Sequence, residues 1–287
     1  MTRPHEVSFK CNSLHPLPLD ISDARAQDKV GLSISRIDVL AFRTTFDVKK
    51  KRGLVPVNVS FFPKEQFARS LNIMIPVFAK NLAVSSRVAV AQAGESLGDI
   101  VVPEGKTGLA TVCSIIVNGV LLKHSIPIDS KFGGILQLRQ GRGLRFVELI
   151  HYASSSLDPS EIFIRGKMTS IVQVAAQGDG KILANFREIP ALSRSLVESV
   201  IDDFTRAGIN GVLALGGIGH PVCQTHVDIN KSGMILIGGL NPVAAAYEAG
   251  IHVDNHAMST VIEFEKLRDI HQSGVTNLNG RLLQADR

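Results

Sequence analysis

The chain has 287 residues, of which 45% are apolar and 20% charged, a balance typical of a soluble globular protein with one large or two small domains. The absence of Trp argues against the stacking of single-stranded nucleic acid, and the net charge of +5 favours acidic partners only weakly. Three cysteines at long spacings, without an apolar leader or a membrane-length apolar stretch, predict a cytoplasmic protein with no disulfide framework and no membrane contact.

The main organising pattern is a match of the sequence with itself. Residues 32–142 align without gaps on residues 157–267, and the Arg-Ser-Leu runs at 69–71 and 194–196 coincide. Repeats at long spacing indicate duplicated structural units. We therefore predict an α/β (α+β) fold of two tandem pseudo-repeats, each a hairpin, helix, strand, strand and helix unit. The two units are expected to pack about a pseudo-twofold.

The first elements of each repeat are predicted from alternating apolar and polar residues. Residues 1–30 are polar, contain proline and show no period, so they are predicted to be a flexible arm. The segments 37–46 and 162–174 alternate and are expected to be strands. Polar turns separate them from second strands at 54–61 and 181–186, so each pair is predicted to form a hairpin.

A helix is predicted after each hairpin. Pro63 and Pro190 stand at the expected helix starts, apolar residues then recur at helical spacing, and Gly208 ends the second helix. Pro76 should kink or shorten the first helix. Two further strands follow in each repeat, at 87–91 and from 106 in the first, and at 211–216 and from 231 in the second.

The second repeat ends with the clearest local signal in the sequence. An apolar strand runs into Gly238-Gly239, after which Asn241 is expected to cap a helix, Pro242 to occupy its first position and Gly250 to end it. This pattern predicts a strand, a tight turn and a helix.

The matching stretch of the first repeat, residues 111–120, is open to two interpretations. The β-branched residues around Asn118-Gly119 favour a hairpin, whereas the repeat favours a helix ending near Ser125. We favour the helix because the flanking matches continue. Residues 143–156 are predicted to connect the repeats through a helix turn or a short strand, and residues 268–287 to form a tail.

The turn at Gly238-Gly239 is a candidate anion site, because backbone N–H groups at a helix start carry partial positive charge. Plain packing of strand on helix is the simpler interpretation of the glycines. If the two repeats face each other, the equivalent turn of the first repeat would line the same cleft, and nearby cations would neutralise a dianion. The predicted ligand-binding residues are Thr111, Cys113, Ser114, Lys123, Lys131, Arg187, Gly238, Gly239 and Asn241.

The other motifs in the sequence indicate neither a bound cofactor nor a bound metal. The glycines at 216–219 are not followed by a helix, which argues against a dinucleotide fingerprint. His220, Cys223 and His226 have ligand-type side chains, but a polar loop is the favoured interpretation. The basic stretch 49–52 and the arginines at 139, 142 and 145 are interpreted as solvated tips, or as contacts for phosphate or an acidic partner. No catalytic motif is present, so we predict a protein that is not an enzyme.

Several longer runs carry a family resemblance. They are residues 102–108, 111–115, 118–124, 132–134, 156–164, 181–191, 238–245 and 257–260. Through them the chain resembles the regulatory domain of the archaeal nitrogen repressor NrpR. The resemblance implies a dimeric repressor of nitrogen-assimilation genes that releases its operator when the effector 2-oxoglutarate accumulates.

Typical members of the family carry a winged-helix DNA-binding domain before the regulatory domain. Only about thirty residues precede the first predicted strand here, so we expect no direct nucleic-acid binding. The expected partners are a second copy of the chain, a winged-helix-bearing paralogue and a small dicarboxylate. The alternatives are an enzyme that acts on a small carboxylate through Cys113 or Glu188, and a protein that binds DNA through its basic hairpins.

Overall fold

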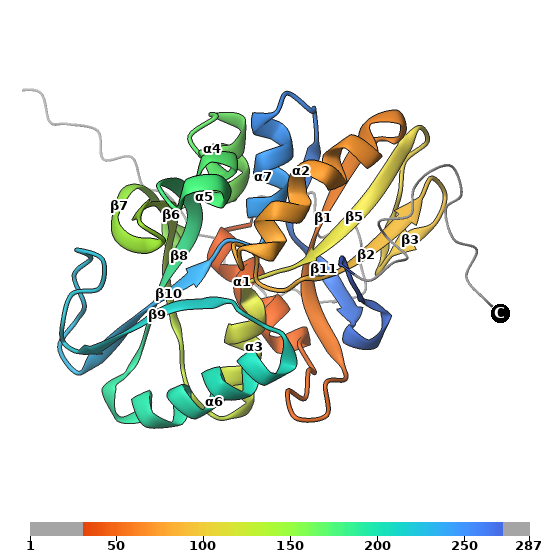
Figure 1. The fold of residues 1–287 in the computed structure, drawn as a ribbon. Helices are drawn as coiled ribbons and strands as arrows, with labels where there is room; N and C mark the ends of the chain where they lie inside the picture. The colour runs from red at the N-terminus through yellow and green to blue at the C-terminus, as the bar shows by residue number, and fades with distance from the viewer. Residues whose placement is uncertain (1–30, 272–287) are drawn as a thin grey trace, which may run out of the picture. The chain divides into compact units, whose positions relative to one another are not determined.

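The computed structural model describes residues 31–271, so the predicted arm and most of the predicted tail lie outside the described residues. The described part is a mixed α/β fold with two five-stranded sheets in which every pairing is antiparallel (Figure 1). The first sheet contains, in order, β11 (Asp254–Glu263), β1 (Leu54–Pro63), β5 (Lys106–Val112), β2 (Arg87–Gln92) and β12 (Arg268–Asp269). The second contains β7 (Arg142–His151), β6 (Asp129–Arg139), β8 (Gly180–Pro190), β10 (Lys231–Ile237) and β9 (Val212–Ile218).

Seven α-helices accompany the two sheets within the described residues, and β3 (Ser96–Leu97) and β4 (Ile100–Val101) form a separate two-stranded sheet that packs next to β2 and β5. The helices are α1 (Ser33–Arg43), α2 (Phe67–Ala79), α3 (Ile115–Lys123), α4 (Pro159–Arg165), α5 (Ile171–Gln177), α6 (Arg194–Ala207) and α7 (Asn241–Glu248). None of the helices described between residues 31 and 271 is long and apolar enough to cross a membrane.

Each sheet takes strands from the other part of the chain: the first contains β11 and β12, and the second contains β6 and β7. β5 belongs to the first sheet, but α3 carries the chain across to β6, which pairs with β8 of the second. In the same way, α7 carries the chain from β10 back to β11, which pairs with β1. The turns that begin α3 and α7 therefore both lie where the chain passes between the sheets.

Two apolar cores hold this exchanged arrangement together. One packs α2, α5 and α7 against strands of both sheets and includes Leu71, Val174 and Ala245. The other lies around α3 and α6 and includes Val117 and Val200. Because both cores combine residues from the two sheets, burial of apolar surface fixes how the sheets meet.

The elements of the two halves follow the same order after their first helices. A shift of 125 residues, the spacing of the sequence match, carries the bounds of β5 onto those of β10. The strand exchange is also reciprocal. A twofold relation between the halves, and the division of the chain at residues 142 and 157, remain predictions.

The predicted first strands at 37–46 and 162–174 are wrong, and so are the hairpins built on them. The first segment lies mainly in α1, where Ile37, Leu40 and Ala41 are buried at helical spacing. The second is divided between α4 and α5. Short apolar runs fit either period, and here the packing of each helix decided the outcome.

The helix interpretation of residues 111–120 is confirmed, because α3 begins at Ile115 and Ser125 lies just beyond its end with a φ of 56°. The helix is almost entirely buried, which explains why its sequence has no polar face. Gly119 is required here because a Cβ would lie 2.3 Å from the Cβ of Thr44 at the end of α1. The predicted helices after Pro63 and Pro190 and the final helix before Gly250 are also present.

Candidate functional site

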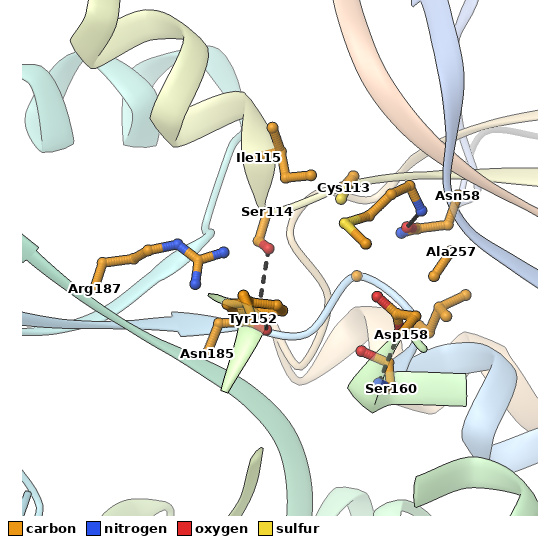
Figure 2. Close-up of a pocket in the computed structure, with 13 residues that line it drawn as sticks. Asn58, Cys113, Ser114, Ile115, Tyr152, Asp158, Ser160, Asn185, Arg187 and Ala257 are labelled. Atoms are coloured by element: carbon orange, nitrogen blue, oxygen red, sulfur yellow. Dashed lines mark hydrogen bonds between the residues drawn. The ribbon is translucent and has the colours of Figure 1, made fainter. Parts of the chain in front are cut away.

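A small cavity lies where the chain crosses between the sheets (Figure 2). Cys113 and Ser114 reach it from the turn before α3, and Gly239 and Leu240 from the turn before α7. The two turns touch, since a Cβ on Gly239 would lie 2.6 Å from the carbonyl oxygen of Val112. The structure thus places both turns side by side, and only glycine fits at this closest approach.

Arg187 of β8 is the charged group that dominates the cavity. Its side chain is 1% exposed, yet no carboxylate among the described residues forms an ion pair with it. One guanidinium nitrogen donates to the carbonyl oxygen of Phe186 at 3.3 Å, and the group lies 4.8 Å from the ring centre of Tyr152. Its Nε has no hydrogen-bond partner. A buried cation without an anion is costly, so this arrangement is suited to bind one.

Asn185 orders the polar groups beside Arg187. Its Oδ1 accepts a hydrogen bond from the Tyr152 hydroxyl at 2.5 Å, and its Nδ2 donates to Ser114 Oγ at 3.0 Å. Burial raises the pKa of Tyr152 to about 12, so the phenol keeps its proton. Because Ser114 Oγ already accepts from Asn185, its own proton is free to turn toward a ligand.

Asp158 brings a carboxyl group to the cavity on the side away from Arg187 (Figure 2). It caps α4, with Oδ1 accepting from the backbone N–H groups of Ser160 at 2.8 Å and Glu161 at 3.2 Å. Burial, reinforced by the nearby Glu161 carboxylate, raises the pKa of Asp158 to about 6. The cavity therefore carries a cation at one end and, at the other, a carboxyl whose pKa is raised to about 6.

A bulge in β11 forms another part of the wall. Met258 has a φ of 51°, a conformation that L-residues rarely adopt, and the pairing of β1 with β11 shifts register at this point. Asn58 Oδ1 holds the bulge by accepting from Met258 N at 3.0 Å, and Glu161 accepts from Ala257 N at 2.7 Å. Strained backbone of this kind is typical of ligand-binding sites.

The cavity is small as it stands. Its volume of about 20 Å³ has room for little more than one water molecule, which requires roughly 10–15 Å³. A dicarboxylate would enter only after the surrounding groups move apart. The site is therefore a polar, closed junction between two sheets.

Four of the nine predicted ligand residues line this cavity, namely Cys113, Ser114, Arg187 and Gly239. Gly238 instead packs against Leu183 of β8. Thr111 lies within β5, where its buried hydroxyl has no hydrogen-bond partner. Lys123 lies at the far end of α3 beside a separate open groove.

The remaining two predicted residues are held by other groups. Asn241 does not cap α7 as expected; it is the first helical residue and is fully buried. Its amide accepts from Leu183 N at 2.8 Å and donates to the carbonyl oxygens of Leu82 at 3.0 Å and Leu183 at 3.1 Å. The predicted capping role is wrong because these backbone groups satisfy the side chain instead.

Lys131 lies in an ion-pair cluster away from the cavity. Its Nζ is 2.8 Å from Asp129, 3.1 Å from Glu188 and 3.3 Å from Asp228. Asp129 and Glu188 raise the pKa of Lys131, so its ammonium group stays protonated and its positive charge is compensated by the carboxylates around it. The cluster leaves no cationic charge for a ligand.

The residues of the enzyme alternative are poorly placed for chemistry. Burial raises the pKa of Cys113 to about 11, so the thiol rather than the reactive thiolate is present at neutral pH. Glu188 is paired with Lys131. Within residues 31–271 no three His, Cys, Asp or Glu side chains gather to hold a metal, and the Sγ of Cys223 lies 3.3 Å from the carbonyl oxygen of Gly143.

Sequence reasoning missed nine residues that line the cavity. They are Asn58, Ile115, Tyr152, Asp158, Ser160, Asn185, Leu240, Ala257 and Met258. Asp158 and Asn185 fall within runs that carry the family resemblance, but no local pattern marks them as ligands. They meet only because β1, β8, β11 and α4 converge in the fold.

The fold, compared with known proteins, identifies a regulatory type of domain. A solved structure with the same fold is a nitrogen repressor-like protein from Methanococcus jannaschii, with a TM-score of 0.72 and 25% identity over 84% of this chain and 100% of that one. The family model described as NrpR regulatory domains NRD1 and 2 matches residues 30–269. The chain belongs to this family.

Curated relatives agree with this assignment. The chain is 34% identical over 251 residues to the global nitrogen regulator NrpRI of Methanosarcina mazei, covering 88% of this chain and 77% of that protein. It is 26% identical over 268 residues to the global nitrogen regulator NrpR of Methanocaldococcus jannaschii, covering 92% of this chain but 45% of that protein. The chain thus spans less than half of the second relative.

Proposed function

We propose that this chain is an effector-sensing subunit that regulates transcription of nitrogen-assimilation genes and catalyses no reaction. The observation that carries the proposal is Arg187, a buried cation that no carboxylate between residues 31 and 271 pairs with, in a cavity between the two sheets of an NrpR-type regulatory domain. A small anionic metabolite would supply the missing charge. The relatives, named as global nitrogen regulators, support the process that is controlled.

The proposed effector is 2-oxoglutarate. One of its carboxylates would meet the Arg187 guanidinium, with the Ser114 hydroxyl as a further donor. Because the cavity now has room for little more than a water molecule, the effector would stabilise a more open arrangement of the two sheets. Such a difference in affinity between two arrangements is what allows a ligand to act as a signal.

The proposed route to DNA is through a partner. The family model that matches residues 30–269 describes regulatory domains, and contact with an operator would come from a winged-helix-bearing paralogue. The proposed unit is a homodimer of this chain that joins this partner. The opening of the cavity would then change how the partner's DNA-binding domains are spaced.

Calorimetric titration of the full chain with 2-oxoglutarate tests the sensing function, with succinate as the control ligand. We expect saturable heat with 2-oxoglutarate and the same compound recovered unchanged. Arg187→Met should abolish the heat, whereas Arg206→Met, at an arginine whose side chain is 69% exposed, should not. Heat that persists in a folded Arg187→Met protein, or no heat with the native chain, would contradict the proposal.

A second measurement tests the partner. Duplex operator DNA should be bound by a mixture of this chain and a winged-helix-bearing paralogue, and 2-oxoglutarate should release it. Tight operator binding by this chain alone, weakening steeply with salt, would instead favour direct binding through its basic hairpins.

A further inference from the structure

Asp158 is the one acidic group among the residues that line the Arg187 cavity. Its carboxyl is 7% exposed, and Oδ1 is fully used as the cap of α4 through the N–H groups of Ser160 and Glu161. No hydrogen bond to Oδ2 is present within the described residues. One oxygen of this buried acid is therefore structural, and the other is available to whatever fills the cavity.

The groups around Asp158 leave its charge poorly compensated. Glu161 on the same helix adds a second negative charge, while Arg36 on α1 provides partial compensation from outside the cavity. The Cys113 thiol and the Tyr152 phenol face it as neutral groups, and Arg187 lies on the opposite side. From β1 and β11 the cavity receives only uncharged side chains, those of Asn58, Ala257 and Met258.

We propose that Asp158 binds the effector as a neutral acid, so that filling the cavity with a small carboxylate takes up one proton from solvent. The inference rests on the proposed effector site. The proton is added to Oδ2, which then donates a hydrogen bond to an oxygen of the ligand, and no other bond changes. Asp158 is thereby a specificity-determining residue for anions that carry an acceptor at the end remote from Arg187.

The physical reason is that two anions cannot share one buried site. A ligand carboxylate or carbonyl beside ionised Asp158 would meet like charge and an unsatisfied lone pair at low dielectric, whereas a protonated acid offers a donor. Burial and Glu161 already bring the pKa of Asp158 to about 6, so protonation at neutral pH needs only a modest further shift. A ligand with an ammonium group would prefer the ionised form and take up no proton.

Proton uptake on binding makes the affinity for the ligand depend on pH. Above the pKa of the empty site the protein must acquire a proton in order to bind, so affinity should fall as pH rises, by up to roughly tenfold per pH unit. Below that pKa Asp158 is already protonated, and affinity should no longer depend on this group.

The test is calorimetric titration of the full chain with 2-oxoglutarate between about pH 6 and pH 8, in two buffers of different ionisation enthalpy. We expect uptake near one proton at the upper end of this range. Asp158→Asn keeps an equally good helix cap and mimics the neutral acid, so it should bind with little pH dependence and without uptake. Asp99→Asn, which removes a carboxyl that is 60% exposed, should behave as the native chain.

The outcomes separate this inference from the function on which it rests. Binding by the native chain without proton uptake would overturn the role of Asp158 and leave the effector site intact. Uptake that persists in Asp158→Asn, or is lost instead in Glu161→Gln, would also overturn it. No heat with the native chain or with Asp158→Asn at any pH would overturn the proposed effector site, and this inference with it.

Discussion

Arg187 and Lys131 are cations on neighbouring strands, and the structure gives them opposite surroundings. Ser130 of β6 is paired in register with Arg187 of β8, and Asp129 with Glu188. Successive residues of a strand point to opposite faces, so Arg187 faces the cavity while Glu188 faces Lys131. Three carboxylates surround Lys131, whereas none in the described part of the chain pairs with Arg187. A buried cation without a carboxylate partner is therefore a candidate anion-binding group, whereas a cation already paired with carboxylates is not.

Ligand affinity is the most direct test of the difference between Arg187 and Lys131. We expect Arg187→Met to reduce affinity for 2-oxoglutarate by at least roughly a hundredfold, enough to remove measurable heat, because about two charge-assisted hydrogen bonds are lost. Its stability should change little, because replacing a buried unpaired charge by an apolar side chain is often neutral. Titration and thermal unfolding of the same sample measure both. Equal losses of affinity in Arg187→Met and Lys131→Met would show that the two cations do not differ.

The turn that faces Arg187 provides a second test. Gly239→Ala should lower the free energy of unfolding by about 2 kcal/mol, because the new Cβ would lie 2.6 Å from the carbonyl oxygen of Val112. Gly217→Ala, at an exposed position whose nearest neighbour is the exposed His220 side chain at 3.2 Å, is the matched control. Denaturant unfolding that gives the same midpoint for both variants would contradict the close approach of the turns.

Lys131 should be important for stability rather than for binding. Lys131→Met leaves Glu188, whose side chain is 2% exposed, without its cation, and should cost about 1–2 kcal/mol after allowance for the partly exposed Lys131. Its affinity for 2-oxoglutarate should stay within roughly twofold of the native value. A large loss of affinity in a stable Lys131→Met protein would place the ligand at the ion-pair cluster instead.

The smallest effect is expected at Thr111, which was predicted to bind ligand but lies away from the cavity. Its buried hydroxyl has no hydrogen-bond partner, so Thr111→Val should raise the free energy of unfolding by about 0.5–1 kcal/mol and leave affinity unchanged. Ser114→Ala removes a hydroxyl that does line the cavity and should weaken binding several-fold. Weaker binding in Thr111→Val would show that β5 contributes to the site.

Local chemistry predicted many of the elements in this fold. The prolines before α2 and α6, the glycines at 208 and 250 and the apolar runs of β5 and β10 all mark element boundaries that the structure has. The same reasoning fails at α1, where the alternation at 37–46 predicts a strand although Ile37, Leu40 and Ala41 form a buried helical stripe. A short apolar run is compatible with both periods until a partner surface selects one.

The candidate site was only partly predictable for a related reason. Cys113, Ser114 and Gly239 were found because the repeat places them in equivalent turns, and Arg187 because it is a cation near one of those turns. Asp158 and Asn58 belong to a helix cap and a strand interior, and neither has a sequence signal that indicates a ligand. Lys131 was chosen on the same grounds as Arg187, and only the carboxylates around it show the difference.

By itself the sequence determined the order of most elements, the two glycine-flanked or serine-flanked helix starts, and the family to which the chain belongs. Only the tertiary structure decided that β6 and β11 change sheets, that the two helix starts meet, and which cation lacks a counter-ion. The physical reason is the distance along the chain over which each kind of interaction acts. Helix and turn signals act over a few residues, whereas burial and charge compensation depend on groups that the fold brings together from distant parts of the chain.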